Sequence, residues 1–330
     1  MTDTALTPPA SAHLPRPADL EQYRRELTGY CYRMLGSSTE AEDVVQEVLL
    51  RAWQALPDFQ GRSSLRTWLY RIATNRCIDH LRQRPRRALP MDLGPASTVH
   101  DRFGDPTPAH GWVEPMPDGR VVPDDADPAT RAVVRETLRL ALIAALQVLP
   151  PKQRAVLILR EVLGWPALDV AELLDTSVPA VNSALQRARA TLADRELDAG
   201  DLYTPSDDEQ RRLLDRYLDA FERYDLDAFE ELLHEDATQS MPPWDFWIQG
   251  RDQVRAWMEG PGAGCRGSKL RLVAANGMPA VAQWRADPEG GHSPWALHVL
   301  TIRDGEVAGI ESFLETDRWF PLFDLPAEPA

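Results

Sequence analysis

The chain has 330 residues, of which 43% are hydrophobic, so it is long and apolar enough for about two or three folded domains. Its net charge of -15 argues against a protein that is basic throughout, and no run of about 18 apolar residues or leader-like start indicates a membrane span or a secretory signal. We therefore expect a cytoplasmic protein with no membrane partner. The cysteines, Cys31, Cys77 and Cys265, lack the spacing of zinc sites or disulfide frameworks, so we expect no metal and no cofactor.

The charge is unevenly distributed along the chain. Between Gly61 and Pro90 there are eight arginines and one acid, Asp79, whereas from Pro205 onward 24 acids face 12 bases. Salt limits each charge's field to about 10 Å at 0.1 M ionic strength. A local basic segment can therefore bind phosphates although the whole chain is acidic.

The first third of the chain predicts an all-helical domain over 19–87. Residues 1–18 are rich in Pro, Ala and Thr without apolar periodicity and are expected to be a disordered lead. Apolar spacing predicts a helix over 20–35, and Thr39 with Glu42 has the capping-box spacing that starts a second helix ending near residue 55. Ser63 or Ser64 can cap a third helix that ends near residue 84.

The middle of the chain predicts a linker followed by a second helical domain over 131–198. Residues 88–130 contain eight prolines, four glycines and eight acids but few aliphatic residues, so this acidic linker is not expected to fold alone. Helices are then expected over 132–148, 154–163, 166–174 and 178–192. The short turn Asp175-Thr176-Ser177 between the last two gives a helix-turn-helix pattern.

The last part, over 206–326, predicts an α+β domain. Helices are expected over 209–224, 227–233 and 252–258, followed by strands over 269–275, 278–285, 295–302 and 307–314. Asp304-Gly305 is a hairpin signal between the last two strands. The expected fold class is thus multidomain, with two all-α domains followed by an α+β domain with an antiparallel sheet.

Three surfaces are candidates for binding. On the third helix, Arg71, Asn75, Ile78 and Arg82 share one face beside Trp68 and Tyr70, a combination that can bind phosphates, hydrogen-bond a base edge and stack on unpaired bases. A solvated basic helix is the alternative. On the second helix, Asp43 and Glu47 can bind a basic partner or simply face water. The helix-turn-helix can present its second helix to DNA or be a helical hairpin without DNA. Its outward polar residues are Thr176, Ser177, Asn182, Ser183, Gln186, Arg187 and Arg189.

At residues 20–197 the combination of motifs resembles the extracytoplasmic-function sigma factors of bacterial RNA polymerase. TEAEDVVQEVLLRAW looks like their segment that grips the clamp helices of the largest polymerase subunit, which implies that role for Asp43, Glu47 and Trp53. PDFQGRSSLRTWLYRIATNRCIDHLRQR looks like their segment that melts and recognises the -10 promoter element. The residues to which this implies a -10 role are Phe59, Gln60, Arg62, Ser63, Trp68, Arg71, Asn75 and Arg82.

The second helical domain looks like the family's -35-recognising domain, to which the helix-turn-helix residues would belong. Asn182 stands where relatives often have Lys. The resemblance also implies that the linker threads through the polymerase's RNA-exit channel, with being a linker only as the alternative.

The C-terminal segment resembles the SnoaL-like group of the NTF2-like fold, a cone around a pocket, as found in a subgroup of these sigma factors. Possible pocket residues are Trp244, Trp247, Trp257, His298 and Glu311, and Asp236, His298 and Glu311 are candidate acid/base groups. No paired carboxylate or nucleophile motif is present, so a regulatory role, with an unknown small ligand in the pocket as one option, is favoured over catalysis.

These observations predict an alternative sigma factor that binds core RNA polymerase and promoter DNA, is not an enzyme, and is modulated by its own C-terminal domain without requiring a separate anti-sigma protein. One alternative is a stand-alone helix-turn-helix regulator, which would bind duplex DNA unaided. The other is a ligand-transforming SnoaL-like enzyme with a DNA-binding appendage.

Overall fold

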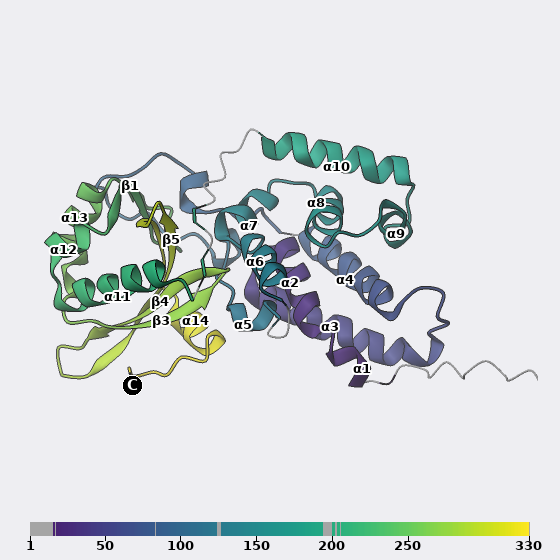
Figure 1. The fold of residues 1–330 in the computed structure, drawn as a ribbon, viewed down its shortest axis with the longest axis horizontal. Coiled ribbons are helices and arrows are strands. Elements are labelled where there is room, and N and C mark those ends of the chain that lie inside the picture. Colours follow the sequence, from purple (N-terminus) through teal and green to yellow (C-terminus); the bar gives the residue numbers. More distant parts are fainter. Residues whose placement is uncertain are drawn as a thin grey trace, which may run out of the picture.

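The computed structural model describes residues 16, 18–82, 84–123, 127–193, 200–201, 203–204 and 206–329, so nearly all of the predicted disordered lead lies outside it. Two helical domains and an α+β domain lie side by side, with the linker and α5 to α7 at their junction (Figure 1). No helix in the described parts of the chain is long and apolar enough to cross a membrane.

The N-terminal domain consists of α1 (Ala18–Glu21), α2 (Arg24–Leu35), α3 (Ser38–Ala55) and α4 (Leu65–Leu81). The single helix predicted over 20–35 was wrong, because a turn separates α1 from α2. The cap predicted at Thr39 was also wrong: Ser37 caps α3, its Oγ accepting the Glu40 amide at 3.1 Å. Ser64 caps α4 as predicted, accepting the Thr67 amide at 3.0 Å.

Where the linker (88–130) is described, it packs on the neighbouring domains instead of lying free between them. It contains the short turns η2 (Pro90–Asp92) and η3 (Ala109–Gly111) and the helix α5 (Asp118–Val121), and its last residues begin α6 (Pro128–Glu136). Several apolar residues of the linker are buried where it packs on the neighbouring domains. These residues are Trp112, Val113, Met116, Val121 and Val122.

The second helical domain contains α6, α7 (Leu140–Leu146), α8 (Pro151–Leu157), a π-helical turn η4 (Ile158–Val162), α9 (Ala167–Leu173) and α10 (Val178–Ala193). One helix was predicted over 132–148, but the structure has two helices there, α6 and α7, separated by a turn. There Arg139 turns its guanidinium to the carbonyl oxygens of Gly200 and Asp201, at 3.0 and 2.8 Å. The predicted helix-turn-helix is formed by α9 and α10.

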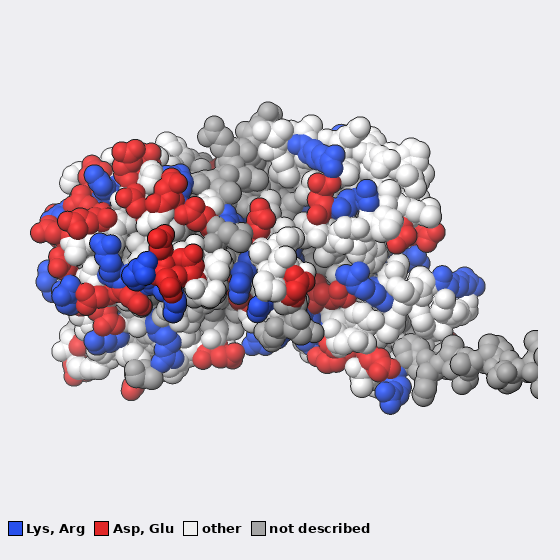
Figure 2. Space-filling view, viewed as in Figure 1, with Lys and Arg blue, Asp and Glu red and all other residues white. Residues whose placement is uncertain are grey.

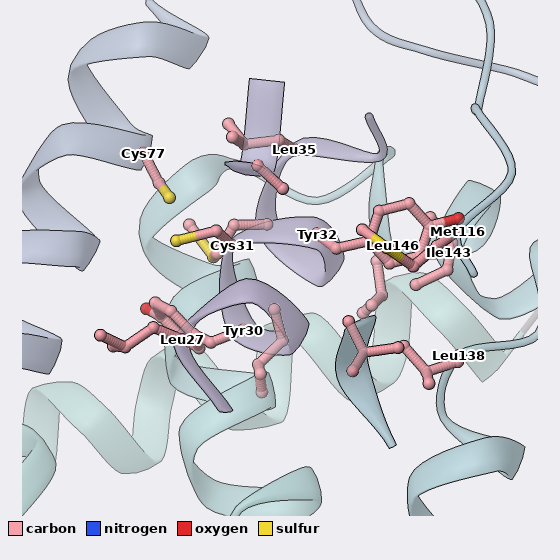
Figure 3. Packing of buried hydrophobic residues seen from close by; sticks show 14 of the residues in the cluster. Leu27, Tyr30, Cys31, Tyr32, Leu35, Cys77, Met116, Leu138, Ile143 and Leu146 are labelled. Atoms are coloured by element: carbon pink, nitrogen blue, oxygen red, sulfur yellow. The ribbon is translucent and has the colours of Figure 1, made fainter. Parts of the chain in front are cut away.

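The two helical domains and the linker share one hydrophobic core. Figure 3 shows Tyr32 of α2 beside Met116 of the linker and Ile143 of α7, and Leu27 and Tyr30 of α2 belong to the same cluster of buried residues. Each of these side chains is almost completely buried. The two helical domains are therefore packed as one body in this structure.

The C-terminal domain has helices α11 (Asp208–Arg223), α12 (Leu226–Glu230), α13 (Arg251–Glu259) and α14 (Thr316–Leu322), with a 3-10 turn η5 (Pro261–Cys265). Its sheet has the order β2-β1-β6-β5-β4-β3. The strands are β1 (Leu233–Ser240), β2 (Trp247–Gln249), β3 (Lys269–Ala275), β4 (Met278–Ala286), β5 (His292–Arg303) and β6 (Glu306–Phe313). The sheet was predicted as antiparallel, but β1 pairs with β6 in parallel.

Alternation along the strands gives the sheet two covered faces. On β4, Val281 belongs to a cluster with α11 to α13, whereas Ala282 and Trp284 belong to the core that includes α14 and the helical domains. Asp304-Gly305 forms the predicted hairpin turn, with φ of 54° and 75°. A second turn of this kind, Asn276-Gly277, joins β3 and β4.

Candidate nucleic-acid interfaces and an internal cavity

The predicted -10 surface lies on the loop before α4 and along that helix. Gln60, Arg62, Asn75 and Arg82 are exposed. In the loop, Phe59 packs on Trp68 with ring centroids 5.0 Å apart, leaving both rings half-buried. The loop thus presents a small aromatic platform flanked by an amide and a guanidinium, groups suited to an unpaired base and its phosphate.

Most of the basic segment is neutralised by ion pairs within the domain. Glu26 binds Arg66 at 3.0 Å, and Glu47 binds Arg76 at 2.8 Å. Glu40 binds Arg87 at 2.8 Å and Arg84 at 2.6 Å. In the described chain, Arg62 and Arg71 have no carboxylate within ion-pair distance. Figure 2 shows acidic side chains crowded over the C-terminal domain, at the left.

Part of the predicted α4 face is turned inward. Ile78 is buried in the core, and Tyr70 packs on Trp165, just before α9, with ring centroids 5.0 Å apart. The Arg66 guanidinium lies over the same Trp165 ring, at 5.1 Å, and Arg71 Nη2 donates to the Glu172 carbonyl of α9 at 3.2 Å. The -10 surface and the helix-turn-helix are thus in direct contact.

The α3 surface predicted for polymerase is acidic at one end and apolar at the other. Asp43 is exposed, and Trp53 keeps 54% of its surface exposed. Glu47 is held by Arg76 and by Arg51, whose Nη2 lies 2.9 Å from it. Leu50, one helical turn before Trp53 and 49% exposed, extends the apolar part. Leu50 was not among the residues predicted for this surface. Its position three residues before the outward-facing Trp53 is the signal that could have identified it.

The polar residues predicted on the helix-turn-helix are exposed, except that Ser183 is half-buried. Several of them already have partners: Arg187 Nη1 donates to Ser183 Oγ at 2.6 Å, and Arg189 Nη2 lies 2.6 Å from Glu161. Val181, Leu185 and Ala188 form the buried side of α10. The helix therefore presents a polar face as a recognition helix does.

Two buried arginines join the helical domains. Arg33 of α2 donates to Thr137 Oγ1 at 2.6 Å and to the Val134 carbonyl at 3.3 Å. Arg154 of α8 donates to the carbonyl oxygens of Met34 and Leu149. Each is 3% exposed, and burial lowers the pKa of both to about 10. Burying cations on neutral acceptors is costly, so this interface is weaker than its apolar area alone would give.

The β3–β4 turn of the C-terminal domain inserts where the other segments meet. Asn276, completely buried, accepts the Met116 amide at 2.9 Å and donates to Tyr32 Oη at 2.6 Å and to the Leu138 carbonyl at 2.8 Å. The Gly277 amide donates to Asp118 Oδ1 at 2.7 Å. One turn thereby binds the linker and both helical domains.

Glu114 of the linker forms a second junction. Its Oε2 accepts Ser37 Oγ at 2.6 Å and Thr39 Oγ1 at 2.9 Å at the start of α3. Its Oε1 accepts Arg318 Nη2 of α14 at 2.6 Å, and Arg87 lies 3.5 Å away. Glu114 is 2% exposed, so linker, α3 and C-terminal domain are tied at a buried charge.

A cavity of about 300 Å³, partly open to solvent, lies between α11 to α13 and one face of the sheet. The predicted residues Trp244, Trp257 and His298 line it. Trp247 does not, since its Nε1 donates to the Gly94 carbonyl of the linker at 3.0 Å. The remaining aromatic and polar lining residues include Phe103, Tyr217, Phe221, Phe229, Gln239, Gln283, Arg285, Trp295 and Ser312.

The candidate acid/base groups do not come together. On β6 the cavity-lining residues are Ile310 and Ser312, so the alternation of a strand turns Glu311 to the opposite face. Asp236 is exposed on β1. The prediction that Glu311 lines the pocket was wrong, and the same holds for Trp247. Of the candidate groups, the described cavity lining contains only His298.

His298 is held in one neutral form by a chain of hydrogen bonds. Ser268 Oγ donates to the Cys265 carbonyl at 2.7 Å and accepts Gln283 Nε2 at 2.8 Å, which leaves Gln283 Oε1 as the acceptor for His298 Nε2 at 2.8 Å. His298 Nδ1 then accepts Ser312 Oγ at 2.8 Å. Burial lowers the pKa of His298 to about 4. Both ring nitrogens are engaged, so this histidine is a structural member of the cavity wall.

The described residues contain no group of His, Cys, Asp and Glu suited to a metal ion. Cys31 and Cys77 are buried in the helical core, Cys265 is half-buried beside the cavity, and all three are free thiols.

Comparison with known proteins places family domains on all three parts of the chain. Models described as Sigma-70 region 2, Sigma-70 region 4 and SnoaL-like domain match residues 20–87, 139–192 and 214–310. The ECF RNA polymerase sigma factor SigG of Mycobacterium tuberculosis is 46% identical over 94% of this chain and 83% of that protein. SigJ of the same species is 29% identical over 94% of this chain and 96% of its own length.

A solved structure shares the fold of nearly the whole chain. The crystal structure of Mycobacterium tuberculosis SigJ covers 94% of this chain and 99% of its own, with a TM-score of 0.60 and 22% identity. At this identity the likeness concerns the fold alone.

Proposed function

The chain belongs to the extracytoplasmic-function sigma factors and carries a C-terminal SnoaL-like domain. From this premise we propose which of its surfaces bind polymerase and which bind promoter DNA. The α3 surface with Asp43, Glu47 and Trp53 binds the clamp helices of the largest polymerase subunit. The loop before α4 and the exposed residues of α4 recognise the melted -10 element. The polar face of α10 binds the -35 element in duplex DNA.

The contact between α4 and α9 supports the proposal that this structure is a closed form. Elements at -10 and -35 are about 25 base pairs apart, which is about 85 Å of duplex. Arg71 and Glu172 are joined by a single hydrogen bond, so one molecule cannot occupy both elements in this arrangement. Promoter binding then requires α4 to leave α9 and exposes Arg71 to DNA.

The C-terminal domain holds the closed form together, on this proposal. Arg318 of α14 and Asn276 of the β3–β4 turn both contact the linker, and Asn276 also contacts both helical domains. These contacts are within one chain, so no separate anti-sigma protein is needed to keep the helical domains together. The engaged nitrogens of His298 and the positions of Asp236 and Glu311 support a regulatory domain rather than an enzyme.

Transcription with purified core RNA polymerase tests the function. We expect the chain to start transcription at specific promoters, and Asn75→Ala to lower initiation about tenfold or more, since one base contact contributes about 1–3 kcal/mol of discrimination. Gln249→Ala, an exposed amide on β2, is the matched control and should leave initiation unchanged.

The same experiment separates the rival functions. A stand-alone helix-turn-helix regulator would bind duplex promoter DNA without polymerase and would give no start sites with the core enzyme. An enzyme would convert a small molecule without DNA or polymerase. Absence of initiation at every promoter of a genomic library, with a folded chain that binds core polymerase, would refute the proposed function.

A further inference from the structure

We infer that the cavity of the C-terminal domain is a binding site for a flat aromatic small molecule, neutral or anionic, and that Phe103 of the linker forms part of its wall, so that binding fastens the linker to this domain. The inference goes beyond the proposed function, because it assigns a ligand class and couples it to the segment between the two DNA-binding domains.

The walls of the cavity have the chemistry of an aromatic site. Most of its large lining side chains are aromatic, among them Phe229, Trp244 and Trp257, and aliphatic and thioether side chains complete the apolar wall. Its volume of about 300 Å³ is at the lower end of ligand pockets, which suits a fused two-ring system rather than a peptide or a nucleotide.

At least one polar group that lines the cavity has no hydrogen-bond partner among the described residues. Gln239 of β1 lines the cavity and is 7% exposed, and its side-chain amide makes no hydrogen bond to any residue that the structure describes. The amide is accessible from the cavity, so a ligand hydroxyl or carbonyl that bonds to it gains affinity. Ser312 donates to His298 and can still accept a hydrogen bond from the ligand.

The formal charges of the lining favour a neutral or anionic ligand over a cationic one. Among the residues described, no Asp or Glu lines the cavity, and His298 is neutral there. The one cation of the lining is Arg285, whose guanidinium lies 3.9 Å from the ring centroid of Trp295. Trp295 is 39% exposed, which places this pair toward solvent. A carboxylate or phenolate on the ligand can pair with Arg285, whereas an ammonium group would meet no counter-charge.

The linker closes part of the wall. Phe103 packs its ring 4.8 Å from Phe246, 5.2 Å from Trp244 and 5.6 Å from Trp257. The segment around it is pinned by the amides of Ser97 and Thr107, which donate to the carbonyl oxygens of Trp247 and Pro243 at 2.7 and 2.8 Å. A ligand that contacts Phe103 therefore stabilises residues 94–112 on the C-terminal domain.

Calorimetric titration of the full chain with three naphthalenes tests the site. We expect 2-naphthol and 2-naphthoate to bind once per chain and 2-naphthylmethylammonium to bind at least about tenfold more weakly. Gln239→Met should weaken 2-naphthol about fivefold, which corresponds to one hydrogen bond. Phe103→Ala should weaken all bound probes about fivefold, the contribution of one aromatic contact.

Matched variants control for non-specific effects. Gln249→Met makes the same exchange on the neighbouring strand, and Leu93→Ala removes an apolar linker side chain that is 54% exposed and does not line the cavity. Both should bind the probes as the unaltered chain does.

Hydrogen exchange tests the coupling. Saturating 2-naphthol should slow the amides of Ser97 and Thr107 at least threefold in the unaltered chain and leave them unchanged in Phe103→Ala. The inference is overturned if no naphthalene binds, if the cationic probe binds equally well, or if neither Gln239→Met nor Phe103→Ala alters binding. These readouts need no transcription, so this inference and the proposed function can fail independently.

Discussion

Glu114 is the residue at which the linker, α3 and α14 are held by one carboxylate. Glu114→Ala should lower the free energy of unfolding by about 3 kcal/mol, because it leaves Arg318 without this partner and the start of α3 without its acceptor. Urea unfolding followed by tryptophan fluorescence measures this. Glu315→Ala removes the other carboxylate on Arg318, which is 31% exposed, and should cost less than about 1 kcal/mol. Equal losses in the two variants would contradict the assignment.

His298 gives the chain a defined pH dependence. Its pKa is about 4 in the folded chain, whereas an exposed histidine has about 6.5. Between these values only the unfolded chain takes up the proton, so stability falls as pH falls. From pH 7.5 to 5.5 the loss should be about 1 kcal/mol, absent in His298→Gln. Denaturant unfolding at the two pH values checks it, and equal pH dependence in both proteins would contradict it.

For individual residues, exposure to solvent could be predicted from the sequence. Asn75, Gln186 and Asp43 lie outward because helical spacing assigns them to a polar face. The partners of the arginines were not predictable, since Glu40 and Glu47 reach them from another helix. The net basic charge of the segment therefore overstated the free charge on α4.

The Asn276-Gly277 turn is expected to hold the closed form together, and a single substitution can test this. A Cβ on Gly277 would lie 2.4 Å from the Arg135 carbonyl oxygen, so Gly277→Ala should push the turn out of the junction. Gly305→Ala is the matched control: Gly305 also has positive φ, but nothing lies within 4 Å of its Cβ position. Only Gly277→Ala should speed hydrogen exchange at Met116 and Asn276 and alter transcription output. If both variants behave alike, the turn does not hold the closed form.

Elements with clear caps and periodicity were predictable, such as α4 behind Ser64 and the hairpin at Asp304-Gly305. The strand β1 was missed because its pairing with β6 is irregular between Leu233 and Thr238, which breaks the alternation of apolar residues. The β2 strand has only three residues, and α14 contains Pro321, so neither gives a strong signal.

For the whole molecule, the order of domains was predictable but their packing was not. Arg33 and Arg154 are cations, which a sequence places at the surface by default, yet both are buried between the helical domains. The linker looked too poor in aliphatic residues to fold alone, and it packs instead on the surface that the neighbouring domains supply. Such contacts depend on complementary partners far apart in the chain, which no local pattern reports.

The closed arrangement must open if one molecule is to span both promoter elements, and distances between spin labels can follow this. In a Cys265→Ser chain, labels at Asp58→Cys and Ala190→Cys, both exposed, report the separation of the helical domains. We expect one short distance in the free chain and a shift to a much longer one with core polymerase, toward the separation of elements about 85 Å apart. Labels at Gln22→Cys and Asp58→Cys lie within the N-terminal domain and should not change. A transcriptionally active complex that keeps the short distance would show that the domains stay together, because opening is then not needed for initiation.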